Sequence, residues 1–321
     1  MPDIQKTAAL PMPPPKMVKK NKGSKRHLVH FFILPALIFY VGFLIYPILS
    51  AFLNSFYSWN GLTRGEFAGF NNFIRLFTEK PFNDFFVGAI KHNVIYFVVT
   101  IFSKLVIAFL LAILINSKIR GKQFFKTVIF IPKLLSVIVV GYLFSLILNP
   151  TYGSLNTFLD MIGLENLARP WLGDMDLALY VVTLVGSWHG IGFAMLIFLV
   201  GLQTIPGELY EAARIDGASG IRMLFKITIP LSMPSIMIMT ILTFIWSFET
   251  FDLIYAMQGS QAGPYFSTDV LVTYFYRLAF GSVEGGDSIG LGSALAVVIF
   301  MIVAVASAIQ MIFFQRKQID N

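Results

Sequence analysis

The sequence predicts an all-α integral membrane protein with six transmembrane helices, and three observations lead to that fold class. Hydrophobic residues make up 56% of the 321 residues and charged residues only 13%, which is about half the charged share of a soluble domain. Six long apolar segments each reach the roughly 20 residues that a helix needs to cross a bilayer. Lys and Arg residues are concentrated in every second connection between these segments. A disordered chain, a disulfide scaffold and an ordinary soluble enzyme are excluded.

The six apolar segments lack the polar alternation of membrane β-barrels, so we expect helices that satisfy their own backbone hydrogen bonds. They cover residues 29–53, 94–115, 127–148, 177–202, 231–257 and 289–314. The first follows a lysine cluster, as in a signal peptide, but is longer than the roughly 7–15 apolar residues of such peptides and has no small-residue cleavage site. We expect it to remain as an anchor.

The basic residues predict that both chain ends lie in the cytoplasm. With the N-terminus inside, 16 Lys and Arg residues fall in inner segments and six in outer segments, as the positive-inside rule requires. The net charge of +7 is therefore a topology signal, and no nucleic-acid partner is expected because the basic residues form no single face.

This topology divides the chain into four predicted parts. They are a flexible basic cytoplasmic tail at 1–28, a first transmembrane helix with an outer loop at 29–93, a five-helix core at 94–315 that includes a cytoplasmic loop at 205–230, and a cytoplasmic C-terminus at 316–321. The tail lysines either contact anionic lipid headgroups or are simply solvated.

The inner connection at residues 205–234 has a pattern of its own. A short helix is expected at 208–216, because this stretch is rich in good helix formers, and Gly217 is a suitable C-terminal stop. A second helical piece is expected at 221–227. From the residues alone, the short helix either caps the bundle at the membrane interface or serves as a docking element that faces the cytoplasm.

This connection resembles the EAA loop of ATP-binding-cassette (ABC) importer permeases. The matching residues are Glu211-Ala212-Ala213, then Asp216-Gly217-Ala218, followed by Phe225, Ile229, Pro230 and Pro234. Its surroundings are similar to the carbohydrate-uptake branch, the maltose and glycerol-phosphate type, at Gly201-Leu202-Gln203, Phe251-Asp252-Leu253-Ile254-Tyr255 and Tyr274-Phe275-Tyr276-Arg277. The resemblance covers about residues 94–315. The chain departs from the family in the outer turn at 258–264, where the usual Thr-x-Gly-Gly-Pro is missing.

The resemblance implies a type I ABC importer (MetI-like) permease fold with a cytoplasmic coupling helix. In that family a second homologous permease completes the path as a heterodimer, an ATPase dimer binds below, and an extracytoplasmic solute-binding protein delivers a carbohydrate. The implied location is a bacterial or archaeal cytoplasmic membrane. ATPase coupling is implied for Glu211, Ala212, Ala213, Arg214, Asp216, Gly217 and Ala218.

The sequence holds no catalytic constellation. The nearest approach to a phosphate-binding loop, at Gly121-Lys122, has Asn116 in place of the first glycine and Gln123 in place of Ser or Thr. The four histidines are too scattered for a metal motif, and cysteine is absent. We therefore expect no catalytic residue, no metal and no cofactor on this chain, with ATP and Mg²⁺ handled by the partner ATPase.

Four charged residues fall inside the apolar segments, where such residues are costly and often functional. They are Lys104, Lys133, Glu249 and Asp252. The two acids are three residues apart, which predicts that they share a helix face. Either the four charges neutralise one another within the bundle, or Lys104 or Lys133 contacts the cargo, which would suit an acidic sugar.

The sugar pocket of the family maps by distance from the EAA and Phe-Asp landmarks to eight positions. They are Val137, His189, Gly190, Phe193, Thr243, Trp246, Ser247 and Thr250. Aromatic faces stack on sugar rings and hydroxyls exchange hydrogen bonds with them, and the last four positions recur at helical spacing. Two alternatives remain, in which the aromatic residues only pack the bundle and His189 is a satisfied core histidine.

The sequence thus predicts a permease subunit, not an enzyme, of an ABC importer for a di- or oligosaccharide. One alternative is the same architecture with a non-sugar solute. The other is an ion-coupled secondary transporter that uses Glu249, Asp252 and Lys104.

Overall fold

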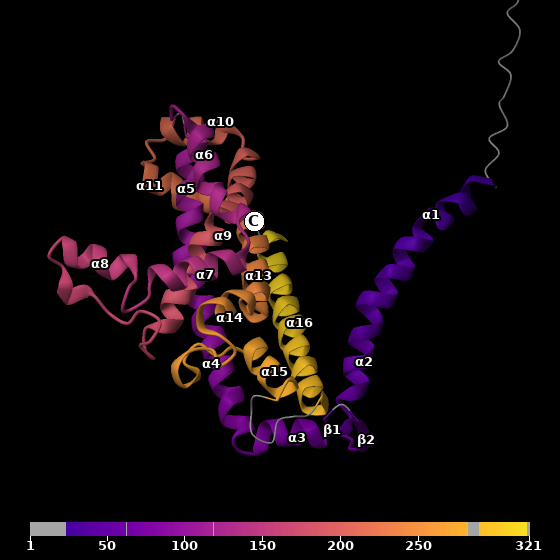
Figure 1. Cartoon of the computed structure of the whole chain (residues 1–321). Helices are drawn as coiled ribbons and strands as arrows, with labels where there is room; N and C mark the ends of the chain where they lie inside the picture. Colours follow the sequence, from indigo (N-terminus) through magenta and orange to yellow (C-terminus); the bar gives the residue numbers. More distant parts are fainter. Residues whose placement is uncertain (1–23, 62, 118, 282–288, 320–321) are drawn as a thin grey trace, which may run out of the picture. The chain divides into compact units, whose positions relative to one another are not determined.

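The computed structural model describes residues 24–61, 63–117, 119–281 and 289–319, and most of them are helical (Figure 1). The chain divides into two units, Met1–Ser50 and Ala51–Asn321. Most of the predicted N-terminal tail lies outside the described residues, as do the last two residues of the predicted C-terminal segment. The all-α class is confirmed, with one short β-hairpin added.

The first apolar segment forms a helix, as predicted. α1 (Ser24–Tyr40) continues through a π-helical turn (Val41–Ile45) into α2 (Tyr46–Asn54). Within it, the 23 residues Phe32–Asn54 are apolar enough to cross a membrane. This length agrees with the expected membrane anchor.

A small β-hairpin, which the sequence analysis did not predict, opens the second unit. β1 (Tyr57–Asn60) pairs antiparallel with β2 (Thr63–Phe67), and α3 (Asn71–Thr78) follows. The buried side chain of Asn72 donates a hydrogen bond of 2.9 Å to the main-chain oxygen of Tyr57. This bond ties α3 to the first strand.

The second span is longer than its apolar segment. α4 (Phe82–Thr100), a π-helical turn (Ile101–Val106) and α5 (Ile107–Asn116) form one candidate span of 35 residues. Residues 82–93, which the sequence analysis included in the outer loop, are helical. The buried positions of this stretch recur at helical spacing, at Phe82, Phe86, Ala89, Asn93 and Tyr96. One face of the helix therefore packs against the bundle while the polar residues occupy the others.

Two further spans are bent helix pairs. One consists of α6 (Lys122–Phe130), a 3₁₀ turn (Ile131–Leu134) and α7 (Val137–Ile147), with a bend of 92°. The other joins Gly220–Leu231 to Met233–Glu249 with a bend of 68°. The described residues thus contain four helices that are long and apolar enough to span a membrane, or up to six if each bent pair is one span.

The helix predicted at 231–257 is interrupted. α13 (Met233–Glu249) ends there, and α14 (Asp252–Gln258) starts a new helix after two non-helical residues. Glu249 and Asp252 therefore do not share a helix face, and that prediction is wrong. The sequence has no Pro or Gly at this point to signal the break.

The buried side chain of Asn93 on α4 accounts for the interruption. Its Nδ2 donates a hydrogen bond of 2.7 Å to the main-chain oxygen of Ser247. In a continuous helix that oxygen would accept from the N–H of Phe251. Its Oδ1 accepts from the N–H of Leu271, 2.9 Å away, at the start of α15 (Leu271–Ala279). One amide therefore satisfies the end of one helix and the beginning of another.

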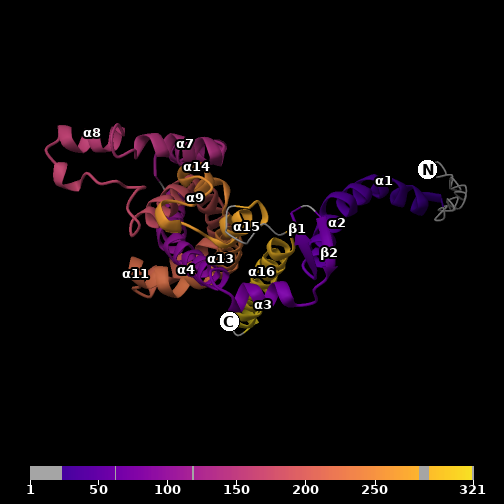
Figure 2. The ribbon, with the colours of Figure 1, turned by 60° about the horizontal axis from the view of Figure 1, so that its bottom comes forward.

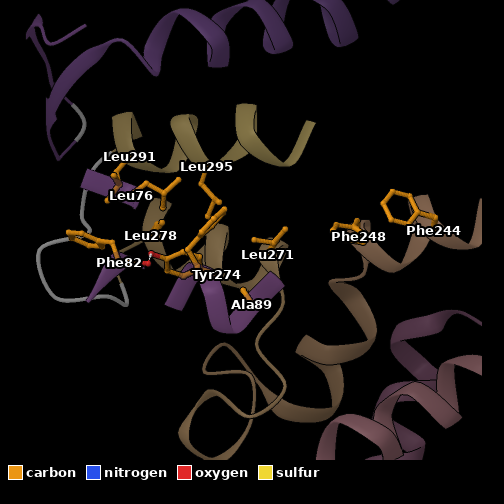
Figure 3. Packing of buried hydrophobic residues seen from close by; sticks show 11 residues of the cluster. Leu76, Phe82, Ala89, Phe244, Phe248, Leu271, Tyr274, Leu278, Leu291 and Leu295 are labelled. Atoms are coloured by element: carbon orange, nitrogen blue, oxygen red, sulfur yellow. Dashed lines mark hydrogen bonds between the residues drawn. The ribbon is translucent and has the colours of Figure 1, made fainter. Parts of the chain in front are cut away.

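α9 (Ala178–Gln203) and α16 (Ile289–Ile319) complete the bundle. α9 packs along α5, where small and large side chains alternate in a buried cluster that includes Ala108, Ala112, Ala194, Met195 and Phe198. α16 packs against α13, α15 and α3. Figure 3 shows the cluster that these helices share with α4, with Tyr274 at its centre and Leu76, Leu291 and Leu295 beside it.

Short elements connect the long helices. Between α9 and α13 lie α10 (Gly207–Ile215), α11 (Gly220–Met223), a π-helical turn (Leu224–Thr228) and α12 (Ile229–Leu231). α10 and α11 lie at the opposite end of this unit from α3 and α15 (Figure 1).

A separate hairpin extends from α7. It contains α8 (Ser154–Met161) and a 3₁₀ turn (Glu165–Leu167), and it stands away from the bundle in both views (Figure 1, Figure 2). A last 3₁₀ turn (Pro264–Phe266) precedes α15.

Replacing Asn93 with Ala should destabilise the bundle, because it leaves a buried carbonyl and a buried N–H without partners. Each such group costs about 1–3 kcal/mol, so the midpoint of thermal unfolding of the detergent-solubilised protein should fall clearly. Asn71→Ala is the control, since the Asn71 side chain is exposed. An Asn93→Ala protein as stable as this control would contradict the assigned role.

Candidate functional site

A cavity of about 310 Å³ lies among the helices of the second unit. α4 and its π-helical turn, α9, α13, and the starts of α7 and α14 contribute its walls. Its lining residues are Tyr96, Thr100, Lys104, Lys133, Val137, Gly186, His189, Gly190, Phe193, Trp246, Ser247, Glu249, Thr250, Phe251, Asp252 and Leu253. Two of the helix breaks border this space: the bend before α7 and the interruption between α13 and α14.

The cavity brings together residues that the sequence analysis singled out separately. Seven of the eight predicted sugar-pocket positions line it: Val137, His189, Gly190, Phe193, Trp246, Ser247 and Thr250. All four charged residues of the apolar segments line it as well. Thr243 does not, because it lies fully buried within α13 and its main-chain oxygen accepts the hydroxyl of Ser247 at 2.7 Å.

The four charged residues do not neutralise one another. In the described part of the chain, no ion pair within 4.0 Å joins any two of them; the ion pairs found there are Arg75–Glu79, Lys80–Asp84 and Arg277–Asp269. Lys104 is buried, whereas Lys133, Glu249 and Asp252 are exposed. The cavity therefore presents unpaired charge.

An aromatic pair forms one wall of the cavity. The rings of Phe193 on α9 and Trp246 on α13 meet edge to face, with centroids 5.8 Å apart. The Nζ atom of Lys104 lies 5.5 Å from the centroid of the Trp246 ring, within the range of a cation–π contact. The indole is thus fixed on one side and exposed to the cavity, with 40% of its surface accessible.

His189 has a structural task at the edge of the cavity. Its Nε2 lies 3.0 Å from the main-chain oxygen of Leu135, so the ring donates a hydrogen bond there. Leu135 precedes α7 and is extended, which leaves its oxygen without a helical partner. The interpretation of His189 as a satisfied histidine is therefore correct for this nitrogen, although the ring also lines the cavity.

Five lining residues were not anticipated from the sequence. They are Tyr96, Thr100, Gly186, Phe251 and Leu253. Tyr96, Thr100 and Lys104 recur at four-residue steps within the predicted helix at 94–115, so the sequence did carry a signal for the first two. Gly186 gave no signal, because its role depends on packing: an added Cβ would lie 2.7 Å from the hydroxyl of Tyr96.

The predicted coupling helix is present as α10, one residue earlier than the expected 208–216. Gly217 ends it with a φ of 74°, which is favourable only for glycine. The N–H of Ala218 bonds to the oxygen of Ala213 at 2.8 Å, and the N–H of Gly217 to the oxygen of Arg214 at 3.1 Å. These two bonds form a Schellman cap, so the predicted stop is confirmed.

The surface of α10 is open. Glu211, Ala212, Arg214 and Asp216 are exposed, and Ile215 is 87% exposed. The Tyr210 hydroxyl lies 3.1 Å from that of Thr228 and holds the helix to the following segment. The expected second helical piece follows as α11 and its π-helical turn. The arrangement favours a docking element over a helix buried against the bundle.

At the other end of the unit, Arg277 is buried and not exposed as an outer-loop residue would be. It donates a hydrogen bond to the carboxylate of Asp269, which also accepts from Thr273. Burial raises the pKa of Asp269, and the adjacent guanidinium opposes that shift. The Asp269 main-chain oxygen lies 2.7 Å from Nδ1 of His92 on α4. This network anchors α15 to the bundle.

Comparison with known proteins identifies the family. Residues 104–319 match the family described as "Binding-protein-dependent transport system inner membrane component". The chain belongs to this family. It is therefore a multi-pass membrane protein of the transport permease type.

Relatives of the permease cover nearly its whole length. It is 35% identical over 302 residues to the probable ABC transporter permease protein YurN of Bacillus subtilis, covering 93% of this chain and 98% of YurN. It is 32% identical over 293 residues to the arabinooligosaccharides transport system permease protein AraP of the same species, covering 90% and 88%.

A solved structure shares the permease fold. A chain of a bacterial ABC transporter involved in the import of the acidic polysaccharide alginate superposes with a TM-score of 0.76 at 24% identity, covering 92% of this chain and 98% of that chain. The predicted type I importer permease fold is thereby confirmed.

Proposed function

We propose that this chain is the transmembrane permease subunit of an ABC importer that takes up a di- or oligosaccharide. The observation that carries the proposal is the cavity whose wall combines the Trp246 and Phe193 rings with hydroxyl and charged groups. An aromatic face covers the apolar side of a sugar ring, and polar groups bind its hydroxyls. The names of relatives such as AraP support a saccharide over other solutes.

The proposal includes an ATPase dimer bound at α10. Exposed small and charged residues, Ala212, Glu211 and Arg214 among them, offer a surface for close contact, and the Schellman cap makes the helix end rigid. α9 lines the cavity near its middle and leads directly into α10. Closure of the ATPases could therefore bias the packing of the helices around the cavity. ATP and Mg²⁺ bind to the partner and not to this chain.

The proposal also assigns a second homologous permease, forming a heterodimer, and an extracytoplasmic binding protein that supplies the solute. The term "binding-protein-dependent" in the family description supports the latter. Family membership favours ATP-driven import over the ion-coupled alternative. The unpaired charges of the cavity are then contacts for the solute and not an ion relay.

Ala213→Trp should abolish transport and weaken binding of the ATPases, because a large side chain prevents close approach to α10. Gly217→Pro should do the same, since proline cannot adopt a φ of 74°. The measurement is co-purification of the ATPases together with solute uptake. Ala168→Trp, in the hairpin that contains α8, is the control. Normal uptake by both α10 variants, correctly inserted, would overturn the coupling assignment.

We further propose that α10 faces the cytoplasm and the α8 hairpin the outside, as the positive-inside rule predicts. The chain has no native cysteine, so the labelling of a single introduced cysteine shows directly on which side of the membrane that position lies. Lys226→Cys and Asp160→Cys both place a thiol at an exposed position. A membrane-impermeant maleimide should label Asp160→Cys on intact right-side-out vesicles, and Lys226→Cys only after permeabilisation. The reverse pattern would contradict the orientation.

A further inference from the structure

We propose that the solute carried through this cavity bears an anionic group that binds the ammonium of Lys104, so that the cargo is an acidic saccharide. This inference rests on the proposed function and names the substrate class of the same cavity. It starts from the one charge in the cavity that is buried.

Lys104 is 7% exposed, and its ammonium makes no hydrogen bond and no ion pair with any described residue. Among the described residues, its ammonium makes a cation–π contact with the Trp246 ring. A buried charge is costly unless it is paired, and a cation–π contact returns only about 0.5–2 kcal/mol. The site is therefore incomplete without an anion or an equivalent set of acceptors.

Two features of the fold direct the Lys104 side chain toward the cavity. Lys104 lies on the π-helical turn Ile101–Val106, a form of helix that often occurs at functional sites. On the facing helix, a Cβ added to Gly190 would lie 3.1 Å from the Lys104 Cδ and 3.9 Å from its Nζ. The absence of a side chain at Gly190 therefore gives the lysine its course across α9 toward the ring of Trp246.

The other titratable groups of the cavity do not supply the missing partner. Glu249 and Asp252 line the same space but lie more than 4.0 Å from the ammonium, since no ion pair forms, and both are exposed. Lys133 adds a second positive charge, and His189 directs its Nε2 to a main-chain oxygen. Lys133 is exposed like the two acids, so Lys104 is the buried charge of this cavity, and it has no counter-ion among the described residues.

An acidic saccharide satisfies both features of this wall. One sugar ring stacks on the exposed face of Trp246, and its carboxylate or sulfonate accepts a charge-assisted hydrogen bond from Lys104. Sugar hydroxyls alone could accept a hydrogen bond but would leave the charge unneutralised. The cavity of about 310 Å³ has room for at least one sugar unit.

The experiment uses the complete transporter in proteoliposomes with its binding protein, and measures ATP hydrolysis stimulated by matched saccharides. The panel pairs uronic-acid oligosaccharides, such as trigalacturonate, with their neutral methyl esters and with neutral di- and trisaccharides. We expect the acidic members to stimulate best.

Lys104→Met should raise the half-maximal concentration of the acidic saccharide at least tenfold, whereas Lys104→Arg should keep most of the response. Lys91→Met, an exposed lysine on α4, is the matched control.

A second readout separates a solute contact from a structural role. Because Lys104→Met removes an unpaired buried charge, the thermal midpoint of the solute-free protein should stay the same or rise. A marked fall would overturn the claim that the ammonium lacks a partner.

Stimulation by neutral saccharides, unchanged in Lys104→Met, would overturn the inference and leave the proposed function intact. Failure of every saccharide, while a non-sugar solute stimulates, would overturn the proposed function and this inference with it.

Discussion

The architecture depends on satisfying main-chain carbonyls where helices break inside an apolar bundle. Water is scarce at such places, so each freed oxygen needs a donor from the protein. Asn93 supplies one for Ser247, and His189 supplies one for Leu135. Both breaks border the cavity, so the side chains that make the breaks possible also open the space. At the 92° bend before α7 and at the gap between α13 and α14, these two hydrogen bonds satisfy carbonyls that the helix breaks leave free.

α9 connects the cavity to α10, the proposed ATPase-binding helix. Within one uninterrupted helix, Gly186 and Gly190 permit close approach of Tyr96 and Lys104, and the C-terminal end leads into α10. α9 packs against α5, α4 and the π-helical turn between them. Under the proposed function, an ATPase bound at α10 and a solute bound in the cavity would both act on α9.

The sequence was sufficient for features that are local in the chain. Apolar length placed the spans, and the helix formers with Gly217 placed α10 to within one residue. The sequence was insufficient where a residue far away in the chain determines the local structure. The break after Glu249 has no Pro or Gly and depends on Asn93, which lies on another helix. The start of α4 was missed because polar residues interrupt the apolar pattern before residue 94. Thr243 was assigned to the sugar pocket by its distance from the landmarks of the family, yet its side chain is fully buried and does not line the cavity.

The most direct test is the chemical accessibility of the cavity during transport. Val137→Cys would place the sole thiol of this chain on the cavity wall, and a small maleimide would report its exposure in the reconstituted transporter. If the cavity is the solute path and α10 controls it, the transported solute should slow labelling several-fold, and trapping the ATPases with ATP should change the rate again. A rate that neither solute nor ATP alters would contradict the account.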